Sequence, residues 1–180
     1  METNSSMVEI NVLCVIDTEL VKKKYPAPSK DPANPTGIVH DSEYMLVTGA
    51  RGDVRGQGTA DLSFRANVGD KVSFTGTSIY ANADDAVIVY GIKFGSGADV
   101  FSHFTTTVLT RYKAVMPDKR IQCGIPPVNQ EINFSKYSAD VQNAGTENFI
   151  VCFALYTLDN TGEGQELFGY YCWDPAITVL

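Results

Sequence analysis

The sequence predicts an all-β fold, a two-sheet antiparallel β-sandwich of jelly-roll-like form, from three observations. Short stretches of alternating apolar and polar residues recur along the chain, Gly and Asn cluster between them, and no strand–helix–strand alternation occurs. The chain has 180 residues, of which 44% are hydrophobic, so it is large enough to bury a substantial core. We therefore expect one domain over residues 1–180.

The N-terminal third predicts one strand, one short helix and one long loop. Residues 8–16 form an apolar run broken by two polar residues and are expected to be a strand. Residues 17–24 are predicted to be helical, because Asp17 or Thr18 can cap the helix and three lysines lie at its C-terminal end, where the helix dipole favours them. Residues 25–36 contain four prolines and are expected to form an extended surface loop.

The rest of the chain predicts strands. Residues 61–75 alternate on both sides of a Val-Gly-Asp-Lys turn and are predicted to form a hairpin. Residues 86–94 and 149–156 are continuously apolar, with β-branched and aromatic side chains, which favours strands at the centre of a sheet. Residues 167–179 are the expected last strand, and Pro175 predicts an edge position or a bend, because proline cannot donate to the ladder.

Charge and cysteine usage exclude several classes of protein. The formal net charge is −7, and Lys22–Lys24 is the only basic cluster, so a nucleic-acid partner is not expected. No apolar run approaches about 18 residues, so no membrane span is expected, and residues 1–6 lack the basic start of a signal peptide. The four cysteines are scattered without CxxC spacing, which predicts free thiols in a reducing cytoplasm.

Enzymatic activity is not expected. The two histidines, His40 and His103, stand in no recognisable catalytic motif, and the sequence has no nucleophile elbow, metalloprotease helix or P-loop. The glycine-rich residues 49–58 lack the Lys-Ser/Thr ending of a phosphate-binding loop, and an alternating strand follows them instead of a helix. A mobile connection between strands explains this stretch better.

Within that stretch, Arg51, Gly52 and Asp53 spell the tripeptide that integrin-type adhesion receptors recognise. Such receptors bind a tight turn that projects a cation and a carboxylate in opposite directions, and the carboxylate completes a metal site on the receptor. The same three residues are also good turn formers in their own right. Both interpretations, receptor adhesion and a structural loop, are therefore open from the sequence.

Two loops rich in oxygen donors are the main candidates for a binding site. Residues 80–85 and 159–166 each combine carboxylates and amides with small residues, which suits Ca²⁺ or the hydroxyl groups of a sugar. Aromatic side chains nearby could cover the apolar face of the sugar. The residues predicted to contact carbohydrate are Tyr80, Asn82, Asp84, Asp85, Glu163 and Trp173.

Several segments together resemble the AidA/PixA family of bacterial inclusion-body proteins. They are INVLCVIDT at 10–18, YPAPS at 25–29, NPTGI at 34–38, GQGTADL at 56–62, VGD at 68–70, GTS at 76–78 and GYYCWDP at 169–175. The resemblance implies a non-secreted protein that accumulates as crystalline cytoplasmic inclusions, with no assigned catalytic residues. Some members are methionine-rich, whereas this chain has only four Met, which argues against sulfur storage.

The two oxygen-rich loops also resemble those of small galactophilic bacterial β-sandwich lectins. In these lectins a tyrosine in one loop and an Asp/Asn/Thr set in the other hold Ca²⁺, and the sugar coordinates that ion. Carried over, the resemblance implies a metal site made by Tyr80, Asp159, Asn160 and Thr161. The chain departs from the lectin pattern at Glu163 and Glu166, where the lectins would offer amides.

The expected function is therefore non-catalytic. We expect a self-associating, homo-oligomeric inclusion-body protein that binds carbohydrate, with Ca²⁺ as a candidate cofactor. Weak single-site affinity for a sugar would be raised by presenting several copies. The alternatives are a structural or storage protein of inclusions without a specific ligand, and adhesion through the Arg-Gly-Asp tripeptide.

Overall fold

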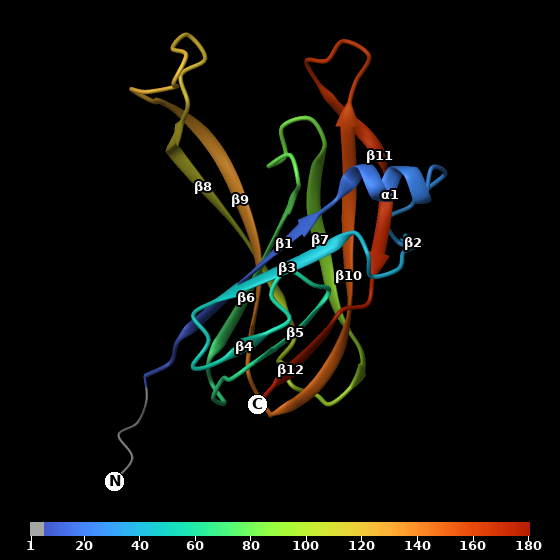
Figure 1. The fold of residues 1–180 in the computed structure, drawn as a ribbon, viewed down its shortest axis with the longest axis vertical. Coiled ribbons are helices and arrows are strands. Elements are labelled where there is room, and N and C mark those ends of the chain that lie inside the picture. Colours follow the sequence, from blue (N-terminus) through green and yellow to red (C-terminus); the bar gives the residue numbers. More distant parts are fainter. Residues whose placement is uncertain (1–5) are drawn as a thin grey trace.

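The computed structural model describes residues 6–180, and in that range two β-sheets and one short helix form the fold (Figure 1). Residues 1–5, on which part of the signal-peptide expectation rests, lie outside the described residues. The elements are β1 (Glu9–Ile16), α1 (Thr18–Lys24), β2 (Thr36–Gly37), β3 (Glu43–Thr48), β4 (Val54–Arg55), β5 (Asp61–Phe64), β6 (Lys71–Ser78), β7 (Ala86–Gly97), β8 (Thr105–Met116), β9 (Val128–Asp140), β10 (Gly145–Leu158), β11 (Gln165–Trp173) and β12 (Ala176–Val179).

The predicted all-β sandwich is confirmed, but its sheets are mixed and not purely antiparallel. One sheet has the order β3-β1-β6-β9-β8; the other has the order β2-β11-β10-β12-β5-β4, with β7 on the opposite edge of β10. Three strand pairs run parallel: β1 with β6, β2 with β11, and β5 with β12. The alternation of apolar and polar residues shows which face of a strand is buried, but it does not show whether the neighbouring strand runs parallel or antiparallel. The parallel pairs could therefore not be predicted from this pattern.

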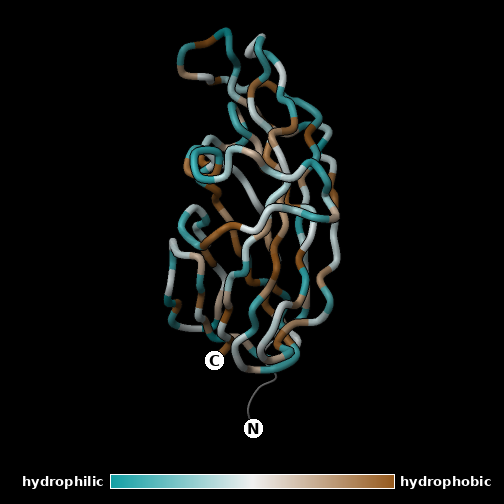
Figure 2. Tube along the Cα trace, turned by 90° about the vertical axis from the view of Figure 1, so that its right-hand side faces the viewer, coloured by the Kyte–Doolittle hydropathy of each residue, from teal (hydrophilic) through white to brown (hydrophobic). Residues whose placement is uncertain are grey.

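The core lies between the two sheets. Strand β1 has the alternation that its sequence predicts, with Ile10, Val12, Cys14 and Ile16 buried on one face. Rings from both sheets meet in the centre; for example, Phe74 of β6 and Phe149 of β10 lie 6.2 Å apart. Figure 2 shows hydrophobic segments along strands in the middle of the molecule, with hydrophilic residues frequent at the turns.

The hairpin predicted for residues 61–75 is wrong, because its two strands belong to different sheets. Strand β5 pairs with β4 and β12, whereas β6 pairs with β1 and β9. The turn between them is held by Asp70, whose carboxylate accepts hydrogen bonds from the backbone N–H groups of Asn67 (2.8 Å) and Val8 (3.1 Å). The turn therefore connects the two layers of the sandwich instead of folding one strand back on the other.

The two apolar runs predicted to be central strands differ in position. Residues 149–156 belong to β10, which is central as predicted, with β7 on one edge and β11 and β12 on the other. The prediction is wrong for β7, which forms an edge and pairs only with β10. Its outward residues Ile88 and Phe94 are about half exposed, so the continuous apolar pattern of this run did not reflect burial on both faces.

The predicted helix and proline-rich loop are confirmed. Helix α1 begins after Asp17, whose carboxylate accepts a hydrogen bond from Leu20 N–H at 3.0 Å. The loop that follows runs along the edge of β11, where Ser29 bridges to Tyr170. A Cβ atom at Gly169 would lie 2.3 Å from Pro28 Cγ, so the loop packs this closely on β11 only because residue 169 is glycine.

The predicted bend at Pro175 is also confirmed. It separates β11 from β12, which pair with successive stretches of the same edge of β10. The Pro175 carbonyl accepts a hydrogen bond from Phe149 N–H at 2.9 Å. Proline lacks a backbone N–H but retains its carbonyl, so the hydrogen-bonded ladder continues across the bend.

Candidate functional site

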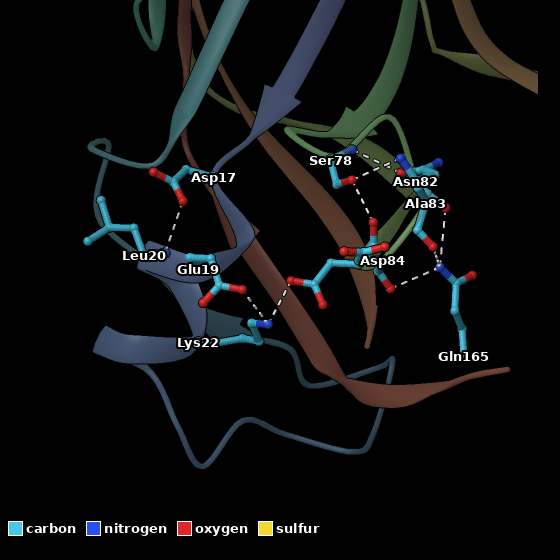
Figure 3. A network of polar contacts seen from close by, with 10 residues as sticks. Asp17, Glu19, Leu20, Lys22, Ser78, Asn82, Ala83, Asp84 and Gln165 are labelled. Carbon is cyan, nitrogen blue, oxygen red and sulfur yellow. Dashed lines mark hydrogen bonds and ion pairs between the residues drawn. The ribbon is translucent and has the colours of Figure 1, made fainter. Parts of the chain in front are cut away.

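The two oxygen-rich loops lie side by side at one end of the sandwich. Gln165, the first residue of β11, reaches from the second loop to the first (Figure 3). Its side-chain amide donates to the backbone carbonyls of Asn82 (3.2 Å), Ala83 (2.8 Å) and Asp84 (3.1 Å). We call residues 79–85 and 159–165 together the joined loops. Gln165 is not among the residues predicted from the sequence, because no local signal indicates that an amide contacts a segment about 80 residues away.

Asn82 holds the first loop in shape. It adopts a left-handed backbone conformation (φ 62°), which asparagine tolerates better than most residues. Its side-chain carbonyl accepts hydrogen bonds from the N–H groups of Ser78 and Val87, both at 2.9 Å, and its own N–H donates to Ser78 Oγ. These bonds give Asn82 a role in positioning the loop, and because the residue is exposed its predicted sugar contact stays a prediction.

Asp85 anchors the same loop to helix α1. Its side chain is buried, and Lys22 Nζ lies 2.7 Å from it and 2.9 Å from Glu19. Burial by itself would raise the pKa of Asp85, but the adjacent Lys22 ammonium and the nearby hydroxyl groups of Thr18 and Thr157 outweigh it and keep that pKa below its ordinary value. Asp85 is thus a buried ionised partner of the helix, not the exposed sugar ligand that the sequence predicted.

The second loop is closed by bonds among its own residues. The Asp159 carboxylate accepts from Thr161 N–H (2.8 Å) and Thr161 Oγ (2.6 Å), and these bonds lower the pKa of Asp159. Of the predicted calcium ligands, Tyr80, Asp159, Asn160 and Thr161, only Asp159 is a carboxylate. Within residues 6–180, no three His, Cys, Asp or Glu side chains gather as a metal site. The calcium site stays a prediction.

The prediction that Trp173 covers a sugar is wrong. Trp173 is 1% exposed and packs edge-on against Phe153, with ring centroids 5.7 Å apart. It occupies an inward position of β11, two residues after the equally buried Tyr171, so the period of the strand places its ring in the core. The predicted residues of the joined loops that are exposed are Tyr80, Asn82, Asp84, Asn160, Thr161 and Glu163.

The Arg-Gly-Asp tripeptide lies elsewhere, beside the turn between the sheets. The Arg51 guanidinium forms a bidentate ion pair with Asp70, with N–O distances of 2.6 and 2.7 Å. The pair holds the pKa of Asp70 at about 2, and Asp70 is buried. Of the tripeptide only Gly52 and Asp53 are exposed, so Arg51 has a structural role, and receptor adhesion stays a prediction.

A long two-stranded ribbon stands next to the joined loops. We call β8, β9 and the connecting residues 117–127 the projecting hairpin, because in Figure 1 it leans away from the other strands. In the part of the chain that the structure describes, residues 137–140 of β9 pair with β6, whereas residues 128–136 of β9 have β8 as their sole partner strand. The ribbon therefore extends beyond the sheet that it starts from.

The projecting hairpin exposes apolar side chains on both of its faces. Val108 and Leu109 are neighbours in β8 and so point to opposite faces, yet both are exposed. Further along the ribbon, Tyr112 is 75% exposed and Val115 is 68% exposed. An isolated two-stranded ribbon is marginally stable in water, and contiguous apolar exposure marks interaction surfaces. This site was not predicted from the sequence, because apolar side chains occur in strands of either kind, exposed or buried.

A groove of about 840 Å³ separates the projecting hairpin from the rest of the molecule. Leu109, Val115 and Phe134 line it on the hairpin side, while Asn82 lines it on the side of the joined loops. A smaller neighbouring cavity, of about 490 Å³, reaches Gln165. The hairpin, the groove and the joined loops thus form one continuous end of the molecule.

Comparison with known proteins identifies the family. No helix within residues 6–180 has the length and apolar character needed to cross a membrane. No curated protein matches the sequence. The crystal structure of an inclusion body protein (PixA) from Burkholderia cenocepacia J2315 is similar over 100% of both chains, with 31% sequence identity and a TM-score of 0.85. The family model of PixA inclusion body proteins matches residues 8–179, and the chain therefore belongs to the PixA inclusion body protein family.

Proposed function

We propose that this protein is a structural building block that self-associates into inclusions, and that the projecting hairpin is its main contact with a second copy. The observation that carries the proposal is the exposure of large apolar side chains on both faces of the hairpin. Burial of such side chains against another molecule stabilises association by roughly 25 cal/mol per Å² of apolar area. Membership of an inclusion body protein family makes another copy of the same chain the natural partner.

Charge supports an arrangement in which the hairpin of one copy meets the joined loops of another. Arg111, Lys113 and Lys119 of the projecting hairpin are exposed, and they have no ion-pair partner among the described residues. Asp84 and Glu163 of the joined loops are also exposed. Because each copy carries a net charge of −7, dense packing of copies requires that oppositely charged regions face each other.

The backbone of β8 offers a second contribution. This strand is the last of its sheet, so the N–H and C=O groups along its outer edge have no partner strand within residues 6–180. Open edges of this kind pair readily with another chain. The register of β8 against β9 shifts between Arg111 and Ala114, which interrupts the ladder near the end of the ribbon. Edge pairing between copies would therefore use residues 105–110.

Light scattering after size-exclusion chromatography tests the proposal. The double variant Val108→Lys/Tyr112→Lys places two charges on the exposed faces, and we expect its association constant to fall at least about 100-fold, from roughly 2–3 kcal/mol of lost interaction. The matched control is Val68→Lys, which changes a valine outside the hairpin that is 72% exposed, against 63% for Val108. Circular dichroism should show that both variants fold. A wild-type protein that stays monomeric at high concentration would contradict the proposal.

Carbohydrate binding is a second candidate function, and the contact of Gln165 with the first loop favours it. This contact places the exposed side chains of Tyr80, Asp84 and Glu163 at one end of the molecule, so that one ligand could touch both loops. A Ca²⁺ ion on Asp159, Asn160, Thr161 and Tyr80 is part of this proposal. A glycan array run with and without EGTA tests it. No binding to any glycan at high protein concentration would rule this function out.

The proposed place of assembly is the cytoplasm. All four cysteines are free, which suits a reducing compartment. Fractionation of cells that make the protein, followed by electron microscopy of the cytoplasmic pellet, tests this directly. Recovery of the protein only from the medium would contradict it.

A further inference from the structure

Two of the four cysteines lie directly opposite each other on neighbouring strands. Cys152 of β10 and Cys172 of β11 are Cα partners in the antiparallel ladder. Their side chains point to the outer face of the sheet, because the residues that alternate with them, Phe153 and Tyr171, are buried in the core. The other two cysteines are far from this pair: Cys14 lies in β1 of the other sheet, and Cys123 is in the tip of the projecting hairpin.

The hydrogen-bond pattern shows which kind of ladder position the pair occupies. The Cys172 carbonyl accepts from Ile38 N–H at 2.9 Å, on the β2 side of β11. Since N–H and C=O of one strand residue point the same way, those of Cys172 point away from β10. Cys152 and Cys172 are therefore a non-hydrogen-bonded pair, for which the Cα atoms lie about 4.5 Å apart. This separation is within the range of about 4.4–6.8 Å that a disulfide requires.

The surroundings hold the two thiols together and leave one of them accessible. The thiols interact with each other, and the Tyr90 hydroxyl interacts with Cys152. Tyr90 also donates to the Pro32 carbonyl at 2.9 Å, so the proline-rich segment lies over this part of the face. Cys172 is only partly buried and lines an open cavity of about 550 Å³, whereas Cys152 is 4% exposed. A small oxidant can therefore reach Cys172 first.

We propose that Cys152 and Cys172 form a cross-strand disulfide when the protein meets a small-molecule disulfide such as oxidised glutathione. Cys172 loses its proton to solvent, and its thiolate attacks one sulfur of glutathione disulfide, which breaks that S–S bond and releases one glutathione thiolate. The Cys152 thiolate then attacks the Cys172 sulfur of the mixed disulfide and releases the second glutathione thiolate. Two protein thiols are oxidised, and one glutathione disulfide is reduced to two thiols. Burial raises the pKa of both cysteines, so we expect the reaction to take hours.

The disulfide would stabilise the end of the molecule that bears the joined loops. The covalent loop from Cys152 to Cys172 spans about 20 residues and contains the second loop and Gln165. Closing it restricts the unfolded chain and fixes the pairing of β10 with β11. The proposal does not depend on self-association, so the two can fail separately.

Intact mass spectrometry of the full chain carrying Cys123→Ser tests the proposal. This substitution removes the exposed cysteine that would otherwise link two copies. After exposure to oxidised glutathione and alkylation under denaturing conditions, we expect a species about 2 Da lighter in its protein part, with one alkylated thiol, and a Cys152–Cys172 linked peptide. A stable glutathione adduct that never closes, or a linkage that includes Cys14, would overturn the proposal.

Thermal unfolding of the oxidised and reduced Cys123→Ser protein provides a second test. The oxidised Cys123→Ser protein should melt about 5–10 °C higher than the reduced protein, and a reductant should reverse the shift. The variant Cys123→Ser/Cys172→Ser should show neither the mass change nor the shift. Equal melting temperatures for the oxidised and reduced forms would show that the crosslink does not stabilise the fold.

Discussion

The molecule contains two long antiparallel strand pairs whose apolar side chains lie in opposite environments. In the pair β10–β11, Phe149, Val151 and Phe153 of β10 are buried in the core. In the pair β8–β9, Val108 and Tyr112 of β8 are exposed. The difference lies in the neighbours: β10 has strands on both edges and the second sheet against its face, whereas, among residues 6–180, β8 pairs with β9 alone. The same residue types therefore stabilise the fold in one pair and remain available for binding in the other.

The largest effect should come from exchanging aromatic residues for alanine in the two pairs. Phe153→Ala removes a fully buried ring that packs on Tyr171 and Trp173, and we expect a loss of about 3–5 kcal/mol in the free energy of unfolding. Tyr112→Ala removes a ring that is 75% exposed, and the expected loss is below about 0.5 kcal/mol. Urea denaturation of the monomer measures both. Equal losses of stability in the two variants would contradict the contrast between the buried and the exposed strand pair.

The next largest effect should come from removing the ion-pair partner of Asp70, and acid titration of stability detects it. The pKa of Asp70 is about 2 in the folded protein, against 3.8 as its ordinary value. A depressed carboxyl pKa contributes stability that is complete above the unfolded value and is lost as pH falls through the folded value. Arg51→Met should therefore cost about 1–2 kcal/mol at neutral pH and flatten the loss of stability between about pH 4 and 2.

The control for this titration is Lys113→Met, which removes a cation from the projecting hairpin and should leave the acid transition unchanged. Denaturant unfolding at a series of pH values gives both curves. A wild-type-like acid transition in Arg51→Met would contradict the assignment of the low pKa to this ion pair.

Within the joined loops, Asn82→Ala should have an intermediate effect. The variant loses the hydrogen bonds from Ser78 N–H and Val87 N–H. It also leaves an alanine in the left-handed conformation (φ 62°) without the side-chain bonds that stabilise asparagine there. We expect a loss of about 1–2 kcal/mol in the free energy of unfolding. Asp84→Ala, at an exposed position two residues further along the same loop, should cost less than about 0.5 kcal/mol. If Asn82→Ala were neutral, its role in positioning the loop would be wrong.

The smallest expected effect concerns the charge of the hairpin. Lys113→Gln should weaken self-association two- to five-fold at low salt, or about 0.5–1 kcal/mol, and the difference from wild type should shrink at about 0.5 M salt. Lys23→Gln is the matched control, because Lys23 is equally exposed but lies on α1. Sedimentation equilibrium measures both. A larger effect of Lys23→Gln than of Lys113→Gln would indicate that the interface lies on the helix side of the molecule and not at the hairpin.

Local features were predictable from the sequence because their causes are local. The Asp17 cap of α1, the bend at Pro175 and the alternation of β1 each depend on residues that are adjacent in the chain. The assignment of Trp173 to a binding site failed for the opposite reason. Its orientation follows from the register of β11 against β10, which positions the side chain relative to a sheet that the local sequence does not describe.

The sequence by itself thus determined the all-β class, the order of most elements and the PixA resemblance, since residue periodicity, turn residues and segment identity are properties of the chain alone. Only the tertiary structure decided that β1 and β6 run parallel, that Gln165 joins two distant loops, and that β8 stays exposed while β10 is buried. Each of these depends on which segment arrives as a neighbour, and that outcome is set by the packing of the whole chain.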